Sequence, residues 1–337
     1  MKQSVIPWII VVIMSIYVYG LTYHVHHRLP PEPSYEFYDT AFVMVEIKGV
    51  EGVHNVYGRF NNILEGKHQL IKAKNQGPDI YQLTFRVNSP RPAILYVDDE
   101  DFEIFLVPGD TSLKVSMEVN PVTYQIDSLD FLGNTAGICN YFQDKSNKFY
   151  QVGLRKNRNI IDSENFEYFS LKLDSMAAME LGFLAEQEIY HDLPEWFVDF
   201  EKNEVLYHKA YLKLSKAFNR EVPQKYLDNI PTKNEAAVFS YYYYLYLNTY
   251  ISNLQRQNDA ESSEVESTLN SEQKLQIADS LLTGEPHDVF MTRVLFTHIT
   301  RGEYEFVRDQ LIKFQNRFSR KKYFRFLRAQ LEKAGAI

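Results

Sequence analysis

Residues 102–119 read FEIFLVPGDTSLKVSMEV, in which two apolar runs are separated by the triplet Pro108-Gly109-Asp110. Proline and glycine at adjacent positions end one strand and turn the chain toward the next. Residues 81–87 show a related texture, because their apolar and polar side chains alternate with the period of two that a half-buried strand has. The pattern predicts short strands joined by turns, which are typical of a small antiparallel β-sandwich or barrel.

Two further runs of β-forming residues lie at 41–47 and 92–97. The acidic run Asp98-Asp99-Glu100-Asp101 separates the second of them from the strand expected at 102–107. Clustered carboxylates can bind calcium, but this run lacks the spaced ligands and the glycine of a helix-loop-helix calcium site. We therefore predict that it forms the solvated tip of a hairpin.

From about residue 130 onward, apolar residues recur at helical spacing. The pattern predicts helices at 140–150, 166–189, 194–218, 233–254, 271–282, 287–300, 303–318 and 320–334. The polar, acidic segment 256–271 contains no aromatic residue and predicts an exposed, mobile loop. We expect an α+β protein with an antiparallel β domain over residues 37–125 and an all-α helical domain over residues 126–337.

The N-terminus predicts a location. Residues 5–23 carry no charge over 19 positions, which is close to the ~20 residues that cross a bilayer as a helix. Aromatic residues lie toward both ends of this segment, and no small-x-small cleavage site follows it. We therefore predict an uncleaved transmembrane anchor over residues 1–28, with Lys2 on the inner side and the body in the periplasm. Residues 29–36 hold three prolines and predict an extended spacer.

Composition excludes several classes of site. The chain has 337 residues, a net charge of −8 and one cysteine, Cys139. A single cysteine excludes an intramolecular disulfide, a Cys-x-x-Cys redox pair and a zinc site built from several cysteines. The acidic balance argues against an extended nucleic-acid surface. Aromatic residues make up 15% of the chain, a generous supply of large side chains for cores and interfaces.

Three features are candidates for chemistry, and for each we favour a structural interpretation. Cys139 has no histidine close in sequence, so it predicts a small apolar residue of a packed helix rather than a reactive thiolate. The run His24-Val25-His26-His27 is a possible metal site, but it fits the flank of a membrane segment better. Ser271-x-x-Lys274 and Ser319-x-x-Lys322 lack the companion motifs of serine–lysine enzymes. We predict no catalytic residue, no cofactor and no metal site.

Two other features leave alternatives open. Residues 241–246 read YYYYLY, which predicts either a buried helix whose hydroxyls reach partners at its edge or the wall of a groove for a partner or glycan. We favour the buried helix. The C-terminal region is basic, and its cations contact either anionic lipid or an acidic partner, or form a solvated helix face. These cations are Arg317, Arg320, Lys321, Lys322, Arg325 and Arg328.

Three short stretches carry a family resemblance. Residues 105–111 read FLVPGDT, residues 131–142 begin FLGNTAG and end NYF, and residues 193–197 read LPEWF. In this order they resemble the N-terminal accessory region, a β domain followed by helices, of bacterial envelope thioredoxin-like proteins of the TlpA/ResA kind. The resemblance extends over most of residues 40–330.

In those relatives a thioredoxin domain with Trp-Cys-x-x-Cys follows the helices, whereas this chain ends about where that domain would begin. No active-site residue is therefore carried over. The resemblance implies a membrane-anchored, periplasm-facing, non-enzymatic binding or scaffold protein with an envelope protein partner, such as a thioredoxin-like protein. The alternative is a component of an envelope thiol-disulfide system, which acts through a mixed disulfide of Cys139 or through a separately encoded thioredoxin half.

Overall fold

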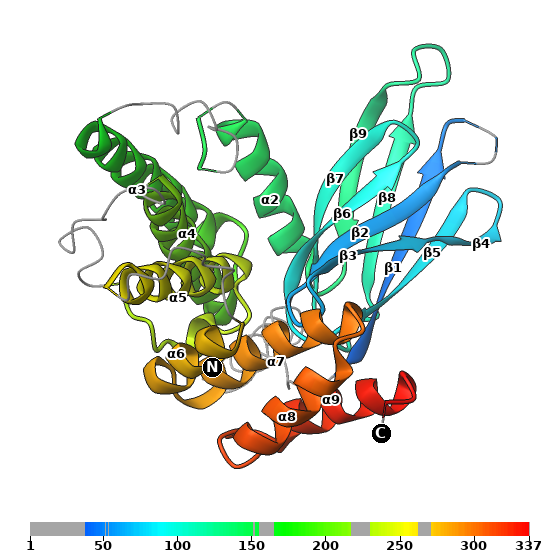
Figure 1. The fold of residues 1–337 in the computed structure, drawn as a ribbon. Coiled ribbons are helices and arrows are strands. Elements are labelled where there is room, and N and C mark those ends of the chain that lie inside the picture. The colour runs from blue at the N-terminus through cyan, green and yellow to red at the C-terminus, as the bar shows by residue number, and fades with distance from the viewer. Residues whose placement is uncertain are drawn as a thin grey trace, which may run out of the picture.

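The computed structural model describes residues 38–336 except 51, 53, 151, 155–164, 217–229 and 262–270. It contains two small β-sheets followed by helices (Figure 1), so the expected α+β class is confirmed. Residues 1–37 lie outside the described part, and with them the predicted anchor, the spacer and the histidine run. Among the described residues, no helix is both long and apolar enough to cross a membrane.

Each sheet combines strands from distant parts of the sequence. Sheet A has the order β4 (Lys74–Gly77), β5 (Ile80–Val87), β1 (Asp39–Lys48), β8 (Leu113–Val119) and β9 (Ile126–Leu132). Sheet B has the order β3 (Lys67–Lys72), β2 (Val56–Asn62), β6 (Arg91–Val97) and β7 (Glu100–Leu106).

The sheets pack against each other through the alternating apolar residues of their strands. Phe60 of β2 meets Phe85 of β5 edge to face, with 5.8 Å between the ring centroids. Gly58 lies on the same strand as Phe60, and a Cβ there would come within 2.4 Å of the Phe85 ring. Glycine at position 58 therefore allows the close approach of the two layers.

The β part differs from the expected antiparallel domain in one pairing. β1 and β8 are parallel, whereas the other pairs of neighbouring strands are antiparallel. The cause is the turn at residues 108–110, which joins β7 of sheet B to β8 of sheet A instead of making a hairpin. The predicted turn is present, but it leads the chain from sheet B to sheet A.

The boundary of the β part also lies later than predicted. β9 occupies Ile126–Leu132, inside the range expected to be helical, and completes sheet A beside β8. The expected strands at 41–47, 81–87, 92–97, 102–107 and 112–119 correspond to β1, β5, β6, β7 and β8. The strands β2, β3, β4 and β9 were not predicted.

The helices follow the predicted order. Their bounds are α2 (Ala136–Phe149), α3 (Phe166–Tyr190), α4 (Glu195–Lys216), α5 (Tyr241–Glu261), α6 (Ser271–Leu281), α7 (Gly284–Thr300), α8 (Tyr304–Phe314) and α9 (Lys321–Lys333), with a short 3-10 turn η3 (Glu235–Ala237) before α5.

One expected helix and one expected loop are corrected. The helix predicted at 233–254 is split, because the Ser240 hydroxyl accepts a hydrogen bond from the Tyr243 amide at 3.0 Å and caps a new start. α5 then continues to Glu261, through the first part of the loop predicted at 256–271. Residues 262–270 of that loop lie outside the described residues.

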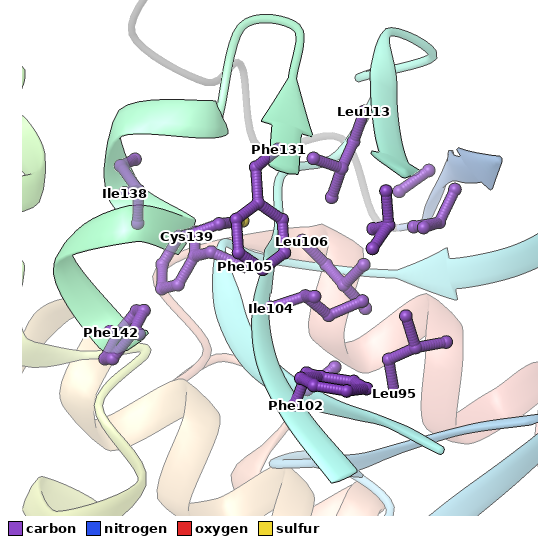
Figure 2. Close-up of a cluster of buried hydrophobic side chains, with 14 of the residues drawn as sticks. Leu95, Phe102, Ile104, Phe105, Leu106, Leu113, Phe131, Ile138, Cys139 and Phe142 are labelled. Atoms are coloured by element: carbon purple, nitrogen blue, oxygen red, sulfur yellow. The ribbon is translucent and has the colours of Figure 1, made fainter. Parts of the chain in front are cut away.

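One buried side chain, Phe105 of β7, joins the sheets to the helices. Its ring centroid lies 5.8 Å from that of Phe142 on α2, and 5.3 and 5.5 Å from those of Phe197 and Phe200 on α4. Figure 2 shows Phe105 beside Cys139 and Phe142 of α2. Strand β7 is an edge strand of sheet B, so this cluster covers an edge that would otherwise be open to pairing with another chain.

A second contact ties the turn after β2 to α7. The Arg293 guanidinium donates to the carbonyl oxygen of Ile63 at 3.1 Å. It also lies against Gly66, whose φ is +68° and whose added Cβ would come within 1.6 Å of the guanidinium. The positive φ favours glycine at position 66, and a side chain there would also displace the Arg293 guanidinium.

We expect Phe105→Ala to destabilise the protein by about 3–5 kcal/mol, because it removes a fully buried ring and leaves a cavity between strand and helices. Chemical denaturation of the full chain measures this change. Val122→Ala is the matched control, since Val122 is 83% exposed and its truncation removes no packed side chain. Equal denaturation midpoints for the two variants would contradict the role assigned to Phe105.

Candidate functional site

The outer face of sheet B, which points away from the other sheet, is the strongest candidate for a site. Residues of β2 and β6 alternate between buried positions in the core and partly exposed positions on this outer face. The strand register places Leu70 opposite Arg59, Arg59 opposite Ile94, and Ile94 opposite Glu103. One row thus crosses all four strands and sets opposite charges on the two sides of an apolar residue.

A cavity of about 220 Å³ opens between this face and the helices. Arg59, Ile94 and Glu103 line it from the sheet, and α4 contributes Phe200 and Glu204. Tyr241 and Tyr242 at the start of α5 close the helical side. The cavity exists because Phe105 and Phe200 hold α4 beside the edge of the sheet, while the first turn of α5 stands off from the outer face.

The aromatic surface continues along the sheet away from the cavity. Tyr57 of β2 and Tyr96 of β6 are paired across the strands and stack with 4.5 Å between ring centroids and an interplanar angle of 10°. The Arg59 guanidinium lies over the Tyr96 ring, 5.4 Å from its centroid. Partly exposed rings and a stacked guanidinium form a surface that binds by apolar contact and stacking.

A buried cation stands at the cavity wall. Arg91 is 3% exposed and donates to the carbonyl oxygens of Ser89 at 3.1 Å and Asn61 at 2.5 Å. Its guanidinium also contacts the Asn88 and Ser89 side chains. Burial lowers the pKa of Arg91 to about 10. The main-chain carbonyls hold this guanidinium in place, so it shapes the wall next to Phe60, over whose ring it lies.

The tyrosine run divides between the core and the cavity. Tyr243 and Tyr246 are buried, and the Tyr243 hydroxyl donates to the carbonyl oxygen of Thr232 at 2.8 Å, as the favoured interpretation requires. Burial raises the pKa of Tyr243 well above that of a free phenol. Tyr241 and Tyr242 instead line the cavity, and Tyr242 stacks on His208 of α4 at 3.7 Å between ring centroids.

Cys139 lies on α2 with no exposed surface, as expected of a small apolar residue in a packed helix. Burial raises the pKa of its thiol to about 12, and Figure 2 shows it facing the aromatic cluster around Phe105. A mixed disulfide needs a thiolate that a second protein can reach. This environment supplies neither the thiolate nor the access, so Cys139 is poorly suited to thiol exchange.

The acidic run lies at the β6–β7 hairpin, where Asp98 and Asp99 form the predicted tip and Glu100 and Asp101 begin β7. Asp98 has φ +52° and accepts hydrogen bonds from the Asn55 amide at 2.8 Å and the His54 ring at 2.7 Å. Together they hold the pKa of the Asp98 carboxyl below its usual value despite partial burial, and the hydrogen bond from the Asn55 amide contributes more than the one from His54. Within the described part of the chain, no group of three or more His, Cys, Asp or Glu side chains is placed to hold a metal ion.

Three of the four residues in the two serine–lysine pairs have partners elsewhere in the fold. The Lys274 ammonium donates to the Asn248 side chain at 2.6 Å, and burial lowers its pKa to about 8. Ser319 donates to Asp288 at 2.6 Å, while Lys322 lies 3.1 Å from Glu285. Lys274, Ser319 and Lys322 are thus held by residues of other helices.

The basic C-terminal region pairs with acids of the same chain. Arg320 and Lys322 lie 3.0 and 3.1 Å from the buried carboxylate of Glu285, which also accepts from the Tyr323 hydroxyl at 2.7 Å. Arg317 lies 3.6 Å from Asp279. These ion pairs of Arg317, Arg320 and Lys322 tie α9 and the turn before it to α6 and α7.

The comparisons with known proteins leave the family open. No protein-family model matches the chain, and no curated protein is significantly similar to it. The resemblance to the accessory region of TlpA/ResA-type proteins therefore stays a prediction. The outer face of sheet B could be found from the sequence only in part. The tyrosine run indicates one wall of the cavity, but the polar strand β3 carries no strand pattern.

We expect Cys139 to be unreactive toward a thiol reagent at pH 8 in the folded protein and to react fully after denaturation, because only unfolding exposes the thiol and returns its pKa toward about 8.5. A thiol-quantifying dye measures both states. Val122→Cys supplies the positive control, with one reactive thiol expected in the native state. Rapid reaction of native wild-type protein would show that the thiol is accessible.

Proposed function

We propose that this chain is a non-enzymatic binding protein of the bacterial envelope. In this proposal residues 5–23 hold it in the cytoplasmic membrane, the body lies in the periplasm, and the outer face of sheet B binds a segment of another protein. The observation that carries the proposal is the continuous half-exposed surface that runs from the Tyr57–Tyr96 stack to the cavity beside α4.

The size of the cavity favours a protein segment over a small-molecule ligand. Sites that enclose a drug-sized ligand typically measure about 300–1,000 Å³. A cavity of about 220 Å³ instead accommodates one or two side chains of a longer segment. The remainder of such a segment would lie along Ile94 and the stacked tyrosines, between the charges of Arg59 and Glu103.

The resemblance described above points to the class of partner. If the chain corresponds to the accessory region of a TlpA/ResA-type protein, a separately encoded thioredoxin-like protein of the envelope is the natural candidate. The cavity and the outer face of sheet B are then the parts of the chain that position this partner, and the redox chemistry belongs to the partner.

We expect Ile94→Glu to abolish retention of the partner, because it places a carboxylate in the apolar centre of the row between Arg59 and Glu103. Full-length protein in detergent is immobilised, exposed to envelope extract and compared with the variant by mass spectrometry. Met44→Glu is the matched control, since Met44 is a partly exposed residue on the outer face of the other sheet.

A protein retained by wild type and Met44→Glu but lost with Ile94→Glu supports the proposal. Equal retention by all three forms contradicts it. A glycan array probed with the same three proteins tests whether a glycan, rather than a protein, occupies this face. Glycan binding by wild type and Met44→Glu that is lost with Ile94→Glu would contradict the protein partner.

We expect the full chain to sediment with membranes and to resist extraction with alkaline carbonate, because residues 5–23 are long enough to span the bilayer. Deletion of residues 1–36 should release the body into the soluble fraction. Carbonate extraction followed by immunoblotting measures both forms. Complete release of the full chain by carbonate would rule out the transmembrane anchor.

A further inference from the structure

Helix α3 lies at the edge of the molecule (Figure 1). Several of its large apolar side chains are exposed to solvent. Its inner side packs through Phe169, Leu173 and Met176, all buried. Its outer side nevertheless carries large apolar side chains, among which Tyr168 is 59% and Leu171 64% exposed. The other large apolar residues exposed on this helix are Met179, Leu181, Ile189 and Tyr190. An extended apolar patch of this kind marks an interaction surface.

The exposed residues form one stripe along the helix. Tyr168, Leu171, Ser175, Gly182 and Ile189 are separated by three, four or seven positions, which places them on one face. Large side chains lie toward both ends of this stripe, and Ser175 and Gly182 lie near its middle. The stripe therefore allows another helix to approach closely at its centre while the ends make apolar contact.

We propose that this stripe binds a second copy of the chain, with the two α3 helices antiparallel and related by a two-fold axis at Met179. In that arrangement, residues at equal distances before and after Met179 meet across the axis. Lys172 lies seven residues before Met179 and Glu186 seven after it. Each Lys172 therefore faces Glu186 of the partner subunit, and the pair occurs twice.

The same axis brings together the aromatic ends of the stripe. Tyr168 lies eleven residues before Met179 and Tyr190 eleven residues after it, so the partner subunit's Tyr190 meets Tyr168. Both tyrosines are more than half exposed in the single chain, at 59% and 77%. Lys172 is exposed, and Glu186, which lies 3.5 Å from Lys148, keeps 69% of its side chain exposed.

Charge complementarity is the reason to choose a second copy as the occupant. One axis matches the two charges to each other and the two tyrosines to each other, and it leaves the small residues Ser175 and Gly182 four and three positions on either side of the axis. A membrane surface would instead favour a stripe flanked by lysines and arginines, whereas α3 exposes Glu186 and Glu188 beside its stripe. Two chains tethered in one membrane would also meet at a raised effective concentration, which helps a single helix pair to associate.

Disulfide crosslinking of the full chain in detergent micelles tests the axis directly. Met179→Cys lies on the axis, so oxidation with copper-phenanthroline and oxygen is expected to give a covalent dimer. Glu188→Cys is the matched control, because position 188 is exposed on the same helix but lies off the stripe. Wild type supplies the background, since its one cysteine, Cys139, is buried. Equal crosslinking at 179 and 188 would indicate random collision and overturn the proposal.

Charge reversal tests the pairing. In sedimentation equilibrium, Lys172→Glu is expected to weaken dimerisation by about tenfold, because both copies of the pair become repulsive. The double variant Lys172→Glu with Glu186→Lys is expected to restore it. Failure of the second substitution to rescue the first overturns the antiparallel register at Met179.

Gly182→Gln separates dimerisation from folding. A Cβ at Gly182 meets no atom within 4 Å in the single chain, so the substitution is expected to leave the fold intact and to raise the melting temperature slightly. It is expected to abolish the Met179→Cys crosslink, because the longer side chain prevents close approach at the axis. If wild type is fully monomeric and its α3 stripe binds lipid vesicles, the occupant of the stripe is a membrane surface and the proposed dimer is wrong.

Discussion

The contact between Phe105 and the helices sets the relation between the two parts of the molecule. An edge strand of a small sheet exposes unpaired backbone groups, and in this protein α2 and α4 cover that edge with rings that pack on one fully buried phenylalanine. Because the contact is made of large interlocking rings, it fixes both the distance and the angle of α4 beside β7. The position of α4, the cavity and the outer face of sheet B all depend on it.

The candidate site follows from that constraint and from the alternation of the strands. Once α4 stands at the edge of the sheet, outward residues near the edge face helical side chains, and outward residues farther away remain in solvent. Ile94 and Glu103 therefore line the cavity, while Tyr57 and Tyr96 stack in the open. The Arg293 contact to the turn after β2 holds the far end of the same sheet against α7. The surface is thus supported at two points, which favours binding without a large rearrangement.

The sequence predicts elements well where periodicity reports burial and poorly where it does not. The strands β1, β5 and β8 and nearly all helices are visible because one face of each is apolar. β3 and β4 are polar edge strands that owe their conformation to pairing with β2 and β5, so no local pattern marks them. The turn at 108–110 would reverse the chain both in a hairpin and in a crossing between the two sheets. Sheet A contains a parallel pair only because β8 pairs with β1. For the site, the tyrosines were visible from sequence, but Arg59, Ile94 and Glu103 come together only through strand register.

The aromatic residues explain how one chain builds a core and binding surfaces from similar side chains. Phenylalanines fill most of the junction, and the one tyrosine packed on Phe142 and Phe197, Tyr141, donates its hydroxyl to Glu201 at 3.2 Å. Tyrosines lie where a ring can pack and its hydroxyl can reach a backbone carbonyl, as Tyr243 does, or reach solvent. Tyr57, Tyr96, Tyr168 and Tyr190 take the second course, so two surfaces of the molecule keep large apolar area exposed without burying an unpaired polar group. An exposed leucine or phenylalanine at every such position would favour non-specific association, whereas tyrosine lets these faces stay hydrated until a complementary partner covers them.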